Sequence, residues 1–69
     1  MKRDGVLTVL QILTTARENV EEVKRIVDAE ALQVGDRNVI DHAIATITGE
    51  MDMLTQTLRG ILEDPTKNE

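Results

Sequence analysis

Arg17, Arg37 and Arg59 are the side chains of this 69-residue chain best suited to bind a ligand. The planar guanidinium group donates paired hydrogen bonds to phosphate or carboxylate oxygens. Hydroxyl groups that suit the same ligand lie near Arg17 and Arg59 in the sequence, on Thr14, Thr15 and Thr55. Arg37 begins an expected helix, where free backbone N–H groups attract anions. The three arginines are therefore candidate contacts for a small phosphorylated ligand, and solvated ion pairs with neighbouring acids are the competing interpretation.

The sequence offers little for catalysis or metal binding. A general base needs an oriented partner and a site that excludes water, and the helical neighbours of His42, Asn38 and Thr46, supply neither. Cysteine is absent, so a disulfide or a zinc thiolate site cannot form. Carboxylate metal sites in helical bundles use a Glu-x-x-His spacing, but Val39 stands three residues before His42. We expect a non-enzymatic protein with no catalytic residue, metal or cofactor.

The charge and composition of the chain limit the classes of partner that it can bind. The net charge of −5 and the absence of Phe, Tyr and Trp argue against nucleic-acid binding, because such binding needs a basic face and usually stacking residues. The longest apolar stretch, Val6 to Leu13, is far shorter than the ~20 residues of a membrane helix. We therefore expect a cytoplasmic protein without a membrane-spanning segment.

Apolar residues recur at alternating intervals of three and four on both sides of Gly35, the period of packed helices. The two stripes are Val6, Val9, Leu13, Ala16, Val20, Val23 and Val27, then Ile40, Ile44, Ile47, Met51, Leu54, Leu58 and Ile61. Folding the chain back near Gly35 sets Leu13 opposite Leu58, and Arg17 level with Met53. The pattern predicts an all-α protein, a two-helix antiparallel hairpin.

Local signals predict the bounds of a single helical-hairpin domain over residues 1–69. Gly35 suits the left-handed position after a helix, and Asp36 suits the N-cap of the next one. Pro65 disfavours helix at the residue before it. We expect helix 1 over about 5–33, a turn at 34–36, helix 2 over about 37–63 and a tail at 64–69.

A two-helix hairpin has one layer of side chains between its helices, and chains below roughly 70 to 80 residues rarely form a sufficient core alone. We expect self-association into a four-helix-bundle-like dimer or higher homo-oligomer. The expected interface comprises Leu7, Leu10, Ile12, Asn19 and Ile26 on helix 1 and Thr48, Thr55 and Leu62 on helix 2. Asn19 is a candidate register mark among these apolar positions. A helix of another protein could cover the same surface.

Gly49 and Gly60 form a second surface of interest. Each glycine in a helix interior costs about 1 kcal/mol relative to alanine. The two lie three turns apart on one face, together with Ala45 and Gln56. This smooth face could admit another helix or a ligand, or the glycines could simply be tolerated.

The expected architecture resembles the small plasmid-copy-control hairpins that dimerise into four-helix bundles. The resemblance concerns the fold, and the acidic charge argues against RNA binding. We expect an adaptor, regulator or inhibitor that acts through protein–protein interaction. In size and build the chain also resembles phage-encoded helical proteins that trap nucleotide signals between subunits. That resemblance implies the alternative function, sequestration of a nucleotide or other phosphorylated ligand by Arg17, Arg37 and Arg59.

Overall fold

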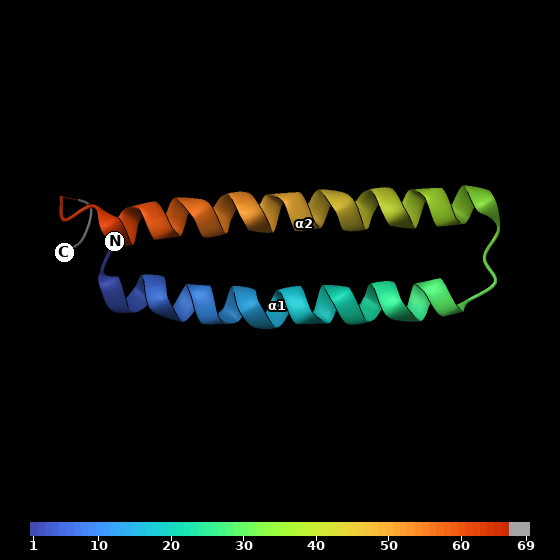
Figure 1. Cartoon of the computed structure of the whole chain (residues 1–69), viewed down its shortest axis with the longest axis horizontal. Helices are drawn as coiled ribbons and strands as arrows, with labels where there is room; N and C mark the ends of the chain where they lie inside the picture. The colour runs from blue at the N-terminus through green and yellow to red at the C-terminus, as the bar shows by residue number, and fades with distance from the viewer. Residues whose placement is uncertain (67–69) are drawn as a thin grey trace.

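The structure, a computed structural model that describes residues 1–66, consists of two long helices joined by a short loop. Helix α1 spans Arg3–Ala29 and helix α2 spans Val34–Glu63. The helices run antiparallel and pack against each other along their length, so the start of α1 and the end of α2 lie at the same end of the hairpin (Figure 1). The molecule measures 50 × 16 × 12 Å. The prediction of an all-α helical hairpin is confirmed.

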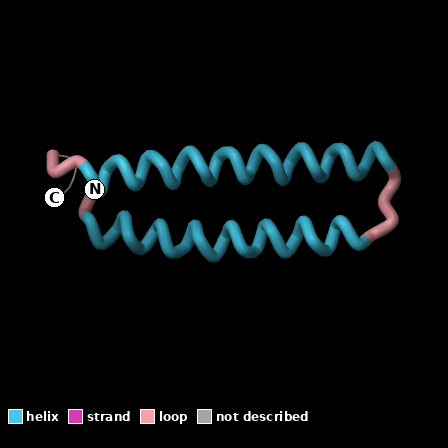
Figure 2. The backbone as a smooth tube through the Cα atoms, viewed as in Figure 1, coloured by secondary structure: helices cyan, strands magenta, loops and turns pink. Residues whose placement is uncertain are grey.

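The loop comprises Glu30 to Gln33 and closes the end opposite the termini (Figure 2). This differs from the predicted turn at 34–36 and shortens helix 1, expected to reach residue 33. Gly35 instead lies in the first turn of α2 with an ordinary negative φ. Asp36 has the same first-turn position, where a carboxylate interacts favourably with the positive end of the helix dipole. The Gly35-Asp36 pair therefore begins the second helix instead of ending the first.

The helix termini carry few side-chain caps. α1 begins at Arg3, two residues before its predicted start, with Asp4 inside the first turn. α2 begins where the backbone N–H of Arg37 donates to the carbonyl of Gln33 at 2.9 Å. α2 ends at Glu63, before the Asp64-Pro65 step. Of the tail predicted over 64–69, residues 67–69 lie outside the described part of the chain.

The seam, the strip along which α1 and α2 face each other, is made of buried and half-buried side chains. They are Val6, Val9, Leu10, Leu13, Ala16, Arg17, Val20 and Val27 on α1, and Arg37, Ile40, Ile44, Thr48, Met51, Thr55, Leu58, Ile61 and Leu62 on α2. Of the described residues only Val6, 0% exposed, and Leu58, 5% exposed, are fully buried. The best-packed part of the seam therefore lies near the termini.

α2 is rotated about its axis relative to the predicted packing. Thr48, Thr55 and Leu62 are half-buried in the seam, whereas Ile47 and Leu54 are exposed. Val23 of the predicted α1 stripe is also exposed. This rotation brings the polar residues of α2 close enough to α1 for ion pairs to form between the helices. Because the hairpin has a single layer of side chains, the outer columns of its apolar stripes stay uncovered.

Candidate functional site

One side of the seam, called here the polar side, carries the ion pairs that join the two helices. Arg17 of α1 pairs with Asp52 of α2, and Arg37 of α2 pairs with Asp28 of α1. The predicted register had set Arg17 level with Met53, and the structure pairs its side chain with Asp52, the preceding residue. The Arg17–Asp52 bridge lies near the middle of the hairpin, and the Arg37–Asp28 bridge lies near the loop.

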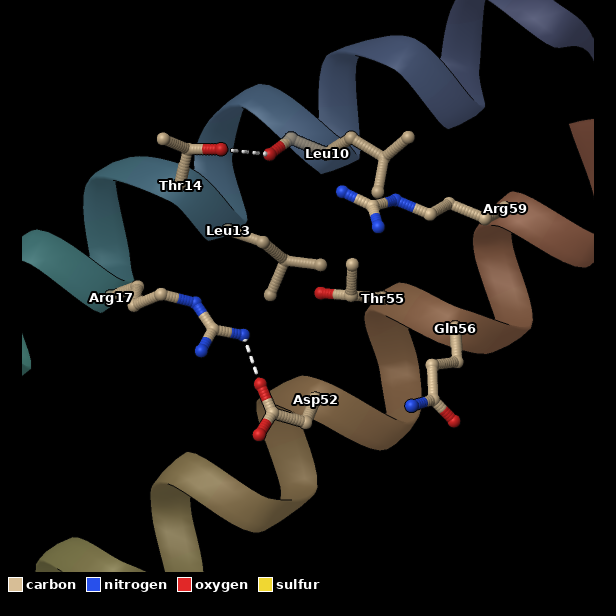
Figure 3. A pocket seen from close by; sticks show the side chains of 8 residues that line it. All are labelled: Leu10, Leu13, Thr14, Arg17, Asp52, Thr55, Gln56 and Arg59. Carbon is tan, nitrogen blue, oxygen red and sulfur yellow. Dashed lines mark hydrogen bonds and ion pairs between the residues drawn. The ribbon is translucent and has the colours of Figure 1, made fainter.

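A cavity of about 370 Å³ opens on the polar side near the termini, and we call it the arginine cavity. Figure 3 shows its lining: Leu10, Leu13, Thr14, Arg17, Asp52, Thr55, Gln56 and Arg59. The cavity brings together four residues singled out from the sequence for anion binding, two arginines and two threonines. Thr15, the remaining threonine of that group, lines a different hollow.

The two arginines reach into the arginine cavity from opposite helices. Arg17 extends from α1 and donates to a carboxylate oxygen of Asp52, while Arg59 extends from α2 toward Leu10 (Figure 3). Arg59 forms no ion pair or hydrogen bond within residues 1–66. The Thr14 hydroxyl donates to the carbonyl of Leu10 at 3.0 Å. The cavity therefore holds two guanidinium groups and one carboxylate.

Arg37, the third predicted ligand contact, lies at the other end of the hairpin. Its guanidinium is held by Asp28 and by Asp41, whose carboxylate it contacts at 3.2 Å. It lines a second cavity of about 690 Å³ together with Val20, Glu21, Lys24, Asp28, Asp41, Ile44, Ala45, Thr48, Gly49 and Asp52. Four acids and two basic residues surround this cavity, so it is a poor environment for an anion. The structure therefore separates Arg37 from Arg17 and Arg59.

Comparison with known proteins adds no family assignment. No family model, curated protein or solved structure matches the chain.

Other site classes find little support in the part of the chain that the structure describes. Residues 1–66 contain no group of three or more His, Cys, Asp or Glu side chains placed to hold a metal ion. Neither helix has the length and apolar character needed to cross a membrane, as far as the described residues go. His42 is exposed, and its backbone carbonyl accepts a hydrogen bond from the Thr46 hydroxyl at 2.9 Å.

The side of the seam opposite the polar side is apolar, and we call it the apolar face. Each of its residues comes one position before a residue of the seam or of the polar side. One position corresponds to a rotation of about 100° around the helix axis. It comprises Val9, Ile12, Ala16, Val23 and Ile26 on α1 and Ile40, Ile47, Leu54 and Ile61 on α2. Several of its large side chains are strongly exposed: Ile12 61%, Val23 50%, Ile26 50%, Ile47 44% and Leu54 44%. Both helices thus contribute uncovered apolar columns to one surface.

A shallow hollow of about 350 Å³ lies at the α1 edge of the apolar face. It is lined by Gln11, Ile12, Thr15, Ala16 and Asn19. Four of these residues have the spacing i, i+3, i+4 and i+7, which forms the hole that accepts a side chain of a facing helix in coiled-coil packing. Ala16 is the small residue of the group. The hollow therefore has the composition of an unfilled packing hole.

The residues predicted for the oligomer interface divide among three locations. Ile12, Asn19 and Ile26 lie on or beside the apolar face and are exposed. Leu10, Thr48, Thr55 and Leu62 lie in the seam of the hairpin itself. Leu7 is 39% exposed and lies on the side of α1 away from the apolar face. Sequence reasoning missed Ile47 and Leu54 as surface residues, although their seven-residue spacing with Ile40 and Ile61 was visible.

Gly49 and Gly60 have open space around them. Gly49 lines the second cavity beside Ala45, and Gln56 of the same predicted row lines the arginine cavity. A Cβ atom added at Gly49 or Gly60 would meet nothing within 4 Å. Neither glycine is therefore required by close packing within the hairpin.

Proposed function

We propose that this chain is a non-enzymatic interaction protein that works as a homo-oligomer, in which a second copy covers the apolar face. The observation that carries the proposal is the exposed apolar surface on one side of the seam. Pairing two such faces encloses the columns of four helices in a common core, as in a four-helix bundle. Its role is that of an adaptor, regulator or inhibitor, which presents its polar surfaces to another macromolecule.

The exposed area of the hairpin supports this arrangement. A folded monomer of 7.7 kDa is expected to expose about 4,300 Å², whereas this chain exposes 5323 Å². The excess is on the order of 1,000 Å², close to the roughly 800 Å² that each partner buries in an interface of standard size. The excess surface of the hairpin is therefore of the size that one partner buries in a stable dimer.

The hollow at Ala16 favours a partner surface that is itself a helix over one without regular secondary structure. A hole with coiled-coil spacing accepts a single large side chain from a facing helix. Candidate side chains stand out from the same face, on Ile47 and Leu54. Because a symmetric dimer places identical patches against each other, these side chains of one copy can fill the hollow of the other.

The experiment that tests the proposal is sedimentation equilibrium over a hundredfold range of protein concentration. The wild type should give a mass of twice 7.7 kDa or a higher multiple, and the double variant Ile47→Asp, Leu54→Asp should shift the mass toward the monomer. Met53→Asp is the matched control, because Met53 is 69% exposed but lies off the apolar face. A monomeric wild type would contradict the proposal.

Dissociation could also unfold the hairpin, so a second measurement is needed. If folding is coupled to association, the thermal midpoint of the wild type must rise with protein concentration. A midpoint that stays constant, together with a monomer mass, would exclude self-association.

A further inference from the structure

We infer that the arginine cavity binds one phosphate group of a small phosphorylated ligand within each copy of the chain. The inference goes beyond the proposed self-association and does not depend on it, because the cavity opens on the polar side, away from the apolar face. It also differs from the sequence-based alternative, in which the ligand lies between subunits. Here Arg17 and Arg59 of one chain form both sides of the site (Figure 3).

The charge distribution favours an anion at this point of an otherwise acidic molecule. The chain has a net charge of −5, yet two guanidinium groups and only one carboxylate line the arginine cavity. Arg59 lacks a partner among the described residues, as noted above. An arginine that reaches toward the facing helix without a counter-charge provides an unfilled donor group for a phosphate.

The neutral lining fits the same ligand chemistry. Thr55 is half-buried at the centre of the cavity, and Gln56 lines its outer edge with the amide pointing away from Thr55 (Figure 3). Both side chains can donate to phosphate oxygens. Leu13 lies between the two guanidinium groups and Leu10 lies next to that of Arg59 (Figure 3). Such apolar surface strengthens nearby electrostatic interactions by displacing water. The chain has no aromatic residue to stack on a base, so recognition falls on the phosphate.

Asp52 acts in this site as an internal competitor. Its carboxylate accepts a hydrogen bond from Arg17, and it occupies the position that a ligand oxyanion would take on that guanidinium. An incoming phosphate therefore has to displace Asp52 or share Arg17 with it. Neutralising Asp52 should consequently strengthen phosphate binding, an effect that a purely structural ion pair would not produce.

The test is isothermal titration calorimetry of the full chain at low salt, with inorganic phosphate, AMP and a cyclic dinucleotide as separate probes. We expect saturable binding with one site per chain. The three probes distinguish binding of free phosphate, of a phosphate monoester and of a phosphodiester. Arg59→Gln should weaken binding about tenfold or more, the effect of losing a charged hydrogen-bond partner. Asp52→Asn should tighten it severalfold.

Two matched variants control for net charge. Arg25→Gln removes the same charge from a residue that pairs with Glu22 outside the cavity, and it should leave the affinity unchanged. Glu50→Gln removes a carboxylate of α2 that lines neither cavity, and it should not tighten binding. If none of the probes binds, or if each control variant changes the affinity as much as its cavity variant does, the inference is wrong. Circular dichroism of every variant establishes that the helices are retained.

Discussion

Arg17 and Asp52, 35 positions apart in the chain, form an ion pair that joins the middle of α1 to the middle of α2. The pair lies on the polar side of the seam and forms part of the arginine cavity. Together with Arg37 and Asp28 it defines which side of the hairpin carries the interhelical charges. The opposite side then retains the uncovered apolar columns, so this pair separates the two surfaces on which the proposals depend.

We predict that the pair contributes little to stability. The side chains of Arg17 and Asp52 are 36% and 51% exposed, and exposed pairs typically contribute 0 to about 1 kcal/mol because water and salt screen them. Asp52→Asn should therefore lower the free energy of unfolding by less than about 1 kcal/mol. Urea denaturation measures the change, and repeating it in 1 M salt should reduce the difference further. A much larger loss would mean that the bridge fixes the packing of the helices.

Gly49→Ala should stabilise the protein. Alanine has a helix propensity about 1 kcal/mol more favourable than glycine, and the new Cβ meets no atom within 4 Å. The expected gain is about 0.5 to 1 kcal/mol in the free energy of unfolding. Gly60→Ala, in equally open space, is the parallel variant. A loss of stability at Gly49 in a self-associated sample would indicate that another copy approaches this surface closely.

Leu58 is expected to be the most sensitive position of α2. It is 5% exposed, and of the described residues only Val6 is buried more fully. Truncation of buried leucine to alanine usually costs about 2 to 5 kcal/mol. Leu58→Ala should therefore unfold much of the protein at 37 °C, as followed by circular dichroism. His42→Gln, at an exposed position, should change stability by less than ~0.5 kcal/mol. Comparable effects of the two substitutions would mean that the seam is wrongly placed.

The sequence predicts the hairpin well because its evidence is periodic. Two apolar stripes of equal length on either side of Gly35 admit few arrangements other than antiparallel helices. The position of the loop was less determined, since Gly35 and Asp36 fit both the end of one helix and the start of the next. The structure uses the second possibility, with the loop at Glu30 to Gln33.

The face of α2 that enters the seam was also not determined by periodicity. Three rows of residues run along α2 with a spacing of seven. The central row, with Ile44, Met51 and Leu58, was correctly predicted to face α1. The two flanking rows are shifted by only one position in the sequence. Hydrophobicity favoured the row with Ile47 and Leu54 for the seam over the row with Thr48 and Thr55. The structure places the threonines in the seam beside the ion pairs. The ion pairs between the helices lie on the same side of the seam as these threonines, and a periodicity of apolar residues does not describe them.

The last prediction concerns Asn19, the polar residue that lines the hollow at the α1 edge of the apolar face. A buried asparagine at such a position lowers the stability of an assembly but fixes its register and number of chains. If a second copy covers the hollow, Asn19→Leu should raise the thermal midpoint and broaden the distribution of oligomers in sedimentation velocity. Glu18→Leu, at a neighbouring exposed position outside the hollow, is the control and should do neither. Equal behaviour of the two variants would place Asn19 in water and remove it from the interface.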